Sequence, residues 1–307
     1  MKILVTGIRG QLGHDVMDAL AVRGIDAVGV NSSDMDVTDE AQVHAVIRRV
    51  GPEAVIHCGA WTAVDAAEDH EAEARAVNAA GTAFVAEACA AVGAKLMYFS
   101  TDYVFDGEGE TPWKPEDPTG PQGIYGQTKL EGEQAVRRIL PDRHFICRLQ
   151  WVYGINGKNF VKTMLRLAED HDRLTVVCDQ IGGPSYTRDI AELASEMIQT
   201  ERYGTYHVAN SGYCSWYDFA RTIFKEAGYT VTSEANDNSN SIVGENSNKC
   251  ITVLPVSSDQ YPAKAKRPHN SRLDTSKLTE AGFKQLPGWQ DALHRFIHNE
   301  LLVSKED

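Results

Sequence analysis

The chain has 307 residues, of which 42% are hydrophobic and 24% are charged, a composition typical of a globular protein that folds without disulfides or metal. Its net charge of −13 argues against non-specific nucleic-acid binding, which draws on clustered lysine and arginine. The apolar start is too short for a signal peptide, and no segment is long enough to span a membrane. Because its six cysteines are scattered without a CxxC pair, we expect a cytoplasmic protein in a reducing compartment.

Short apolar runs alternate with longer amphipathic segments through the first half of the chain. This alternation is typical of strands joined by crossover helices in a parallel sheet. The predicted strands are 3–6, 27–30, 54–57, 96–100 and 145–149, and the predicted helices are 11–22, 39–50, 71–92 and 125–138. We therefore expect an α/β fold of the Rossmann type, with a doubly wound parallel sheet buried on both faces.

The alternation becomes less regular after residue 150. Helices are predicted at 160–169, 189–198 and 216–227, and strands at 174–177 and 206–208. This pattern predicts a smaller mixed α/β lobe over roughly 151–175 and 211–307, which closes over the strand ends where such folds bind ligands. Residues 1–150, with roughly 176–210, would form the larger domain. The Asn- and Ser-rich stretch 233–248 is expected to be a surface loop.

Three glycines directly follow the first predicted strand and open the first predicted helix. Gly7, Gly10 and Gly13 have the spacing GxxGxxG. In a dinucleotide-binding turn the first glycine allows a tight turn, the second admits the pyrophosphate, and the third packs helix against strand. A purely structural turn is the alternative, but the strand-to-helix junction favours a dinucleotide site and makes 1–150 the dinucleotide-binding domain.

The end of the second predicted strand carries Asn31-Ser32-Ser33 in place of the acidic residue that usually binds the adenosine ribose of NAD. Arg9, in the glycine turn, offers a cation to a 2′-phosphate. We therefore predict NADP(H) as the cofactor, with NAD(H) as the alternative. Arg9 could instead lie on a solvated turn. Asp36 and Val37 follow closely and are candidates to flank the adenine.

A tyrosine and a lysine, Tyr125 and Lys129, lie one turn apart at the start of a predicted helix, so the ammonium can sit near the phenol oxygen. That proximity would lower the tyrosine pKa toward working pH. Thr101, at the end of the fourth predicted strand, could hydrogen-bond the same substrate oxygen. A lone YxxxK is usually a surface pair, so the prediction rests on its combination with the glycine turn and Ser100-Thr101-Asp102.

With these motifs in this order, the chain resembles the extended short-chain dehydrogenases, and within them the dTDP-4-dehydrorhamnose reductase family. The matching stretches run through nearly the whole chain. They are 7–13, Asp36-Val37, 60–65 with Glu68, Asn78 with Gly81-Thr82, 100–105, 125–129 with Glu131, 151–154, Asn159-Phe160, and Arg267-Pro268 with Asn270-Ser271.

The resemblance implies NADPH-dependent reduction of the C4 keto group of a dTDP-linked 4-keto-6-deoxy sugar, with Thr101, Tyr125 and Lys129 as the catalytic residues. The cofactor-binding residues would be Gly7, Arg9, Gly10, Gln11, Leu12, Gly13, Asn31, Asp36, Val37, Cys58, Gly59, Ala60, Thr62, Asn78 and Ser100, together with Tyr125 and Lys129. The substrate-binding residues would be Thr62, Val64, Asp65, Thr101, Asp102, Tyr103, Trp151, Asn159, Pro184 and Arg267.

Several of these residues also have structural interpretations. Trp151 could be a core aromatic, Arg267 an exposed loop charge, and Asn78 a residue that breaks a long helix. The chain departs from the family pattern at Gln150, where serine is usual, and at Ser185, where threonine is usual. These departures bear on the identity of the sugar and nucleotide more than on the reaction.

Two other functions remain open from the sequence. The first is a reductase or epimerase of another 4-keto-6-deoxy nucleotide sugar. The second is a non-catalytic regulatory subunit of the methionine adenosyltransferase type, against which the intact Thr101, Tyr125 and Lys129 argue. We predict a nucleotide-sugar substrate, no bound metal, no nucleic-acid or membrane partner, and leave a homodimer open.

Overall fold

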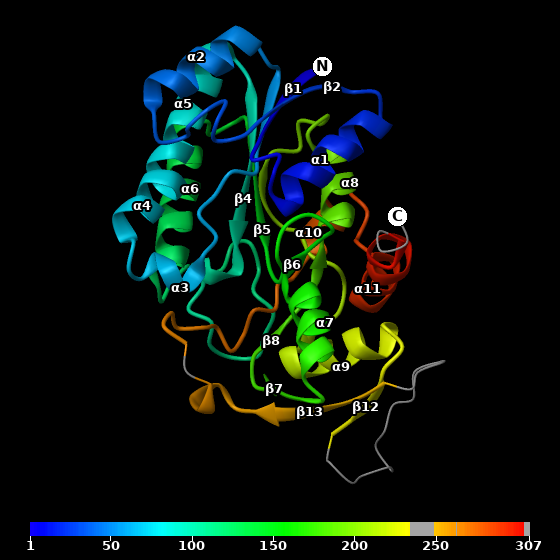
Figure 1. Cartoon of the computed structure of the whole chain (residues 1–307). Coiled ribbons are helices and arrows are strands. Elements are labelled where there is room, and N and C mark those ends of the chain that lie inside the picture. The colour runs from blue at the N-terminus through cyan, green and yellow to red at the C-terminus, as the bar shows by residue number, and fades with distance from the viewer. Residues whose placement is uncertain (234–248, 262, 304–307) are drawn as a thin grey trace.

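A computed structural model describes residues 1–233, 249–261 and 263–303. Its centre is a six-stranded parallel sheet in the order β2-β1-β3-β4-β5-β10 (Figure 1). The strands are β1 (Lys2–Thr6), β2 (Asp26–Val30), β3 (Ala54–His57), β4 (Lys95–Thr101), β5 (His144–Leu149) and β10 (Gly204–His207). Every residue of β3 and β5 is buried, as expected for parallel strands covered on both faces. The predicted doubly wound fold is confirmed.

Helices cover both faces of this sheet (Figure 1). One face carries α2 (Glu40–Val50), α5 (Thr82–Val92) and α6 (Ile124–Ile139), and the other carries α1 (Gln11–Val22) and α8 (Thr187–Met197). Alternate residues of β1 serve the two faces, with Leu4 in one apolar core and Ile3 and Val5 in the other. The sheet is therefore a rigid platform that fixes where each strand ends.

The segment predicted as one helix over 71–92 is divided into three. It forms α4 (Glu71–Arg75), a π-helix η1 (Ala76–Gly81) and α5, and it follows the short α3 (Val64–Ala67). The π-helical turn contains Asn78, whose buried side chain bonds both backbone groups of Trp61. Because this contact joins residues far apart in sequence, helical periodicity alone could not show the interruption.

The second lobe contains a three-stranded parallel sheet in the order β12-β13-β7 and its own apolar core. Its main elements are β7 (Arg173–Val177), β12 (Thr230–Thr232), β13 (Cys250–Val256), α7 (Phe160–Asp170), α9 (Trp216–Glu226), α11 (Trp289–Phe296) and the π-helix η5 (Ile297–Leu301). The remaining short elements are β6 (Val152–Tyr153), β8 (Ile181–Gly182), β9 (Ser185–Tyr186), β11 (Cys214–Ser215) and the 3-10 helix η4 (Ser258–Gln260). Two others adjoin the central sheet: the 3-10 helix η2 (Asp102–Val104) follows β4, and α10 (Ser276–Glu280) packs on β10.

The two-domain division stays a prediction, and its expected boundary at 175–176 falls inside β7, all of which belongs to the sheet of the second lobe. The loop predicted at 233–248 lies outside the described residues except for Ser233. Among the helices in the described part of the chain, none is long and apolar enough to cross a membrane.

Candidate active site

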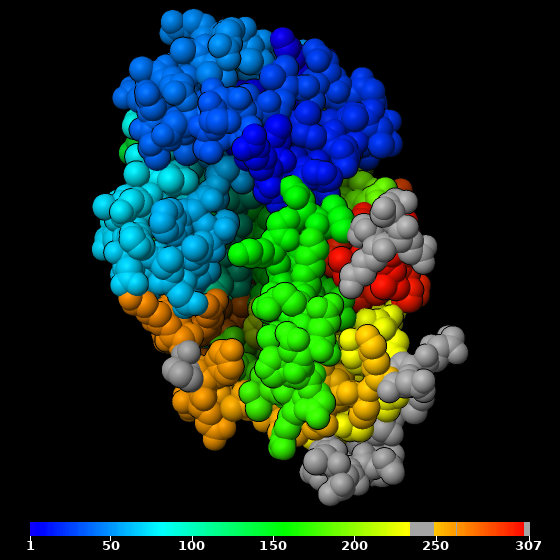
Figure 2. All heavy atoms as spheres, in the orientation of Figure 1, coloured from blue at the N-terminus to red at the C-terminus, as the bar shows by residue number. Residues whose placement is uncertain are grey.

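A cleft of about 970 Å³ opens at the carboxyl ends of the central strands. β1 pairs with β2 on one side and β3 on the other, so the chain changes direction at β1, and the cleft begins at this switch point. α7 and the segments that follow it form the opposite wall, and Figure 2 shows the hollow between α7, in green, and the blue-to-cyan N-terminal part.

The glycine turn has the geometry that a dinucleotide requires. Gly7 adopts a left-handed φ of 68°, and a Cβ there would lie 2.8 Å from the Gly59 nitrogen. A Cβ at Gly13 would lie 2.3 Å from the Gly7 carbonyl oxygen. Since Gly10 is the N-cap of α1 and has no side chain to cap the first turn, the helix N-terminus offers its amide groups to an anion. The turn therefore fits a pyrophosphate.

The end of β2 contains a carboxylate that the sequence interpretation did not consider. Asp34 accepts hydrogen bonds from the Asn31 side chain (2.6 Å) and backbone amide (3.0 Å). Arg9 is exposed and has no ion-pair partner in the described residues. The Asp36 carboxylate accepts two hydrogen bonds from Thr38, which lower the pKa of Asp36. A phosphate bound beside Asn31 would therefore meet a carboxylate.

Asn78 connects the loop after β3 to α6. Its Oδ1 accepts from the Trp61 amide (2.8 Å), and its Nδ2 donates to the Trp61 carbonyl and the Thr128 hydroxyl (3.1 Å each). Because Thr128 precedes Lys129, this side chain fixes the loop from Cys58 to Thr62 relative to the tyrosine-lysine helix. Asn78 does not line the cleft itself.

Thr101 and Tyr125 meet at the centre of the cleft. Both side chains line the cleft, and the Thr101 hydroxyl partly opposes the rise in the pKa of Tyr125. Thr101 donates a hydrogen bond to the Asp102 carboxylate (2.9 Å). Burial raises the pKa of Tyr125, so its hydroxyl carries its proton at neutral pH. Burial also raises the pKa of Asp102 to about 6, against the lowering effect of its hydrogen bonds. The cleft thus presents a protonated phenol beside a threonine hydroxyl.

The expected effect of Lys129 on the Tyr125 pKa was wrong for this structure. The ammonium of Lys129 lies 4.2 Å from the centroid of the Tyr98 ring, in a cation–π contact, and does not contribute to the pKa of Tyr125. Burial lowers the pKa of Lys129 to about 7, and the nearby Glu133 opposes this shift. The spacing of one helical turn predicted a shared face, but the direction of a long side chain depends on its tertiary neighbours.

A buried charged network lies beneath Tyr125 and Lys129, and sequence reasoning missed it. Arg148 makes two hydrogen bonds of 2.8 Å to Glu133, and both residues are at most 1% exposed. His57, also buried, hydrogen-bonds Thr6 (2.7 Å), and burial lowers its pKa to about 3, so it is neutral. Lys129 and His57 line the cleft, and Glu133, Arg148 and Tyr98 lie buried outside its lining. We call these five residues together the cleft floor.

The opposite side of the cleft is half-exposed. Arg267 donates to the Tyr103 hydroxyl (3.2 Å) and forms an ion pair with Asp65. The ring of Tyr103 packs edge-on against Tyr125, with centroids 5.5 Å apart. We call Asp65, Tyr103 and Arg267 the cleft rim. The rim therefore places the Arg267 guanidinium on the far side of the Tyr103 ring from Tyr125 in the chain of contacts Arg267–Tyr103–Tyr125.

Aromatic side chains form the wall next to the rim. Trp151 has a left-handed φ of 44° and stacks on Trp216, with ring centroids 3.6 Å apart. Such a backbone conformation is strained for a bulky residue and is often found at functional sites. Trp216 had no sequence signal beyond its place at the start of a predicted helix. Gln150 accepts from the Gly183 amide (3.0 Å), while its buried Nε2, which lines the cleft, has no partner in the described residues.

The structure brings most of the predicted site residues to one cleft. The predicted residues that line it are Gly10, Gln11, Leu12, Gly13, Cys58, Ala60, Thr62, Val64, Asp65, Ser100, Thr101, Asp102, Tyr103, Tyr125, Lys129, Trp151 and Arg267. Those outside its lining are Gly7, Arg9, Asn31, Asp36, Val37, Gly59, Asn78, Asn159 and Pro184. Their individual roles stay predictions.

Asn159 and Pro184 support the cleft from outside its lining. Asn159 caps α7 by accepting from the Lys162 amide (3.0 Å), and its Nδ2 donates to Gln11 in the glycine turn (2.9 Å). Pro184 is buried between β8 and β9. Asn159 therefore fastens the second lobe to the start of α1.

Comparison with known proteins agrees with this geometry. The family model described as "RmlD substrate binding domain" matches residues 1–302. A dTDP-4-dehydrorhamnose reductase of Streptomyces griseus is 39% identical over 295 residues, covering 94% of this chain and 91% of the relative. That of Escherichia coli (strain K12) is 36% identical over 312 residues and 99% of each chain.

A solved structure gives the same result in three dimensions. The crystal structure of dTDP-4-dehydrorhamnose reductase from Bacillus anthracis in complex with NADP superposes with a TM-score of 0.88 at 38% identity. The match covers 97% of this chain and 99% of the other. The resemblance predicted from the sequence is confirmed: the chain belongs to the RmlD substrate binding domain family.

Proposed function

We propose that the chain reduces the C4 keto group of dTDP-4-dehydrorhamnose with NADPH, giving dTDP-rhamnose. One observation carries this proposal: Thr101 and Tyr125 line the same cleft, which begins at the glycine turn. A ketone bound there would place its oxygen between two hydroxyl donors. The names of the relatives and the NADP in the Bacillus anthracis structure support the choice of substrate and cofactor.

Reduction requires a hydride at carbon and a proton at oxygen. NADPH, when bound, would supply the hydride, and the amide groups at the start of α1 would hold its pyrophosphate. Tyr125 supplies the proton, because its pKa is raised by burial and the phenol is therefore in its acid form. Thr101 holds the ketone oxygen by a hydrogen bond as negative charge develops there.

Lys129 and Asp102 set the charge around this proton transfer. With a pKa lowered to about 7, Lys129 changes charge near neutral pH. Its ammonium lies against Tyr98 and would have to turn toward Tyr125 to favour loss of the phenol proton. Asp102 accepts the single proton of the Thr101 hydroxyl, so this hydroxyl must turn away from Asp102 when it donates to the ketone oxygen. Both groups are buried, which strengthens their electrostatic effect on the reacting oxygen.

The cleft rim is proposed to bind the nucleotide diphosphate. Arg267 is the guanidinium of the rim, and a diphosphate would replace the Asp65 carboxylate as its anionic partner. The stacked Trp151 and Trp216 offer an apolar surface to the sugar. Binding of the whole substrate would then require the Arg267–Asp65 ion pair to open.

The experiment is NADPH oxidation by the purified chain with dTDP-, UDP- and GDP-linked 4-keto-6-deoxy sugars generated in situ. The proposal expects turnover with dTDP-4-dehydrorhamnose and release of NADP⁺ after each reduction. An epimerase would instead retain NAD through turnover. A regulatory subunit would bind the cofactor, oxidise no NADPH with any sugar and co-purify with a stoichiometric enzyme partner.

The remaining expectations of the sequence stay proposals. These are a cytoplasmic location, the absence of nucleic-acid partners, the absence of a bound metal, and a homodimer, which the sequence leaves open. The nearest structural support is the absence of a membrane-spanning helix in the described residues. An active, metal-stripped enzyme of known mass in solution would test the last two together.

A further inference from the structure

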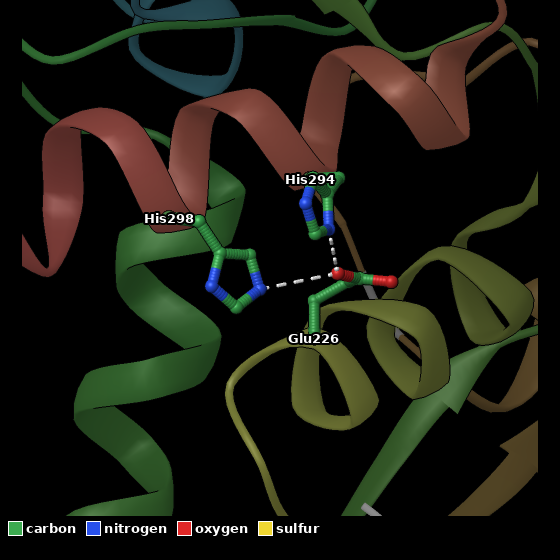
Figure 3. Close-up of side chains that lie close together, drawn as sticks. All are labelled: Glu226, His294 and His298. Atoms are coloured by element: carbon green, nitrogen blue, oxygen red, sulfur yellow. Dashed lines mark hydrogen bonds and ion pairs between the residues drawn. The ribbon is translucent and has the colours of Figure 1, made fainter. Parts of the chain in front are cut away.

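Three potential ligands for a metal converge on the surface of the second lobe (Figure 3). Glu226 is the last residue of α9, His294 lies in α11, and His298 lies in the π-helix that continues α11. The cluster belongs to no part of the cleft, since α9 begins at Trp216 in the cleft wall and Glu226 lies at its other end, about 15 Å along the helix axis.

Both imidazoles lie next to the same carboxylate oxygen. The Nδ1 atom of His294 lies 2.8 Å from Glu226 Oε2, and the Nε2 atom of His298 lies 3.3 Å from it. The two rings are 4.3 Å apart between centroids, and the three ligand atoms all lie within 4.8 Å of one another. Figure 3 shows the two rings side by side on the helix, facing the carboxylate.

These separations suit a tetrahedral metal. Zinc binds histidine nitrogen and carboxylate oxygen at about 2.0–2.2 Å, which puts neighbouring ligand atoms of a tetrahedron about 3.3 Å apart. Two imidazole nitrogens and one carboxylate also favour a borderline transition metal over magnesium or calcium, which prefer all-oxygen sites.

Contrary to the sequence expectation of no bound metal, we propose that Glu226, His294 and His298 form a Zn²⁺ site whose fourth position is open to water. The ligands are partly exposed, so the ion can enter from solvent without opening the fold. The described residues contain two other clusters, His14-Asp15-Asp18 and Glu40-His44-Glu87, each with a single histidine. The paired imidazoles therefore single out the cluster at Glu226.

The bound ion would fasten the end of α9 to the C-terminal helix. α9 and α11 already pack together through the apolar core of the second lobe, and Phe219 and Trp289 contact edge-on there. A metal bridge would add to this packing at the surface without touching the reacting groups. The expected effect is on the stability of the lobe, and turnover should be unchanged.

The test is a zinc titration of the tag-free, metal-stripped chain in competition with a chromogenic chelator. We expect one zinc per chain, at least a tenfold loss of affinity in His294→Gln and in His298→Gln, and wild-type affinity in the control His171→Gln, an exposed histidine elsewhere. Wild-type zinc affinity in the double variant His294→Gln/His298→Gln would overturn the site, as would the absence of saturable binding.

Two further measurements separate this site from adventitious binding. Substitution with Co²⁺ should give a visible d–d band without the near-ultraviolet band of a thiolate, and a thiolate band would place the metal on a cysteine and contradict the proposal. Zinc should raise the thermal unfolding midpoint of the wild type and of His171→Gln but leave the double variant unchanged. An equal rise in all three would mean that the stabilising zinc binds elsewhere.

Discussion

The two sides of the cleft hold charge in different ways. On the floor, Glu133 and Arg148 are at most 1% exposed and bond each other in two places. On the rim, the Arg267 and Asp65 side chains are 33% and 49% exposed. Water screens the rim but not the floor, so the same type of ion pair has a fixed geometry below the reacting groups and an adjustable one above them. The comparison assigns chemistry to the floor and substrate recognition to the rim.

We expect the largest effect on stability from a substitution that removes the Glu133–Arg148 ion pair of the floor. Glu133→Gln would leave the buried Arg148 guanidinium without a compensating charge, and we expect a loss of about 3–5 kcal/mol in the free energy of unfolding. Urea unfolding measures this loss. The matched change on the rim, Asp65→Asn, should cost less than about 1 kcal/mol. Equal losses at the two positions would remove the distinction between floor and rim.

Asp102 should make the free energy of unfolding depend on pH. Its pKa is raised from 3.8 to about 6, so the folded protein binds this proton more tightly than the unfolded chain. The stability from this group is therefore fully present below about pH 4 and is lost as pH rises toward about 6, a change of about 3 kcal/mol. Asp102→Asn should be more stable than the wild type at about pH 7, and the two should converge at about pH 4. A stability difference independent of pH would contradict the assigned burial.

On the rim, Arg267→Gln should affect recognition more than stability. Loss of a charge-assisted hydrogen bond to a diphosphate costs about 1.5–3 kcal/mol, so we expect a rise of about tenfold to a hundredfold in KM for the sugar nucleotide. The kcat and the Kd for NADPH should change little. A fall in kcat with unchanged KM would mean that Arg267 acts in the chemical step and not in substrate binding.

The smallest effect is expected at the exposed Arg9. If its guanidinium binds the 2′-phosphate, Arg9→Ala should raise the Kd for NADPH about tenfold and leave that for NADH nearly unchanged. Asp34→Asn is the matched variant, because it removes the carboxylate held at Asn31 and should tighten NADPH binding. Equal losses for both cofactors in Arg9→Ala would defeat the assignment.

Some parts of the fold and of the site can be predicted from the sequence, and others cannot. The glycine turn, β1 and the bounds of α1 follow from local signals, because strand, turn and helix are adjacent in the chain. Thr101 and Tyr125 both line the cleft because each lies at the cleft end of an element packed on the sheet. These features depend on spacing and periodicity alone.

The missed features depend on contacts between distant residues. Glu133 and Arg148 look like ordinary surface charges until β5 and α6 are packed together. The strand β13 pairs with β7 across a long sequence separation, and the direction of Lys129 is set by Tyr98. Asp34 follows the expected position of a ribose-binding acid by only a few residues, and a turn brings it back to Asn31.

The most direct test of the account is single-turnover reduction by Tyr125→Phe. The phenylalanine keeps the ring in its contact with Tyr103 but removes the proton donor. The account predicts wild-type NADPH affinity and a loss of about 10²- to 10⁴-fold in the rate of NADPH oxidation with dTDP-4-dehydrorhamnose. A variant that binds NADPH normally and reduces the sugar at the wild-type rate would contradict it.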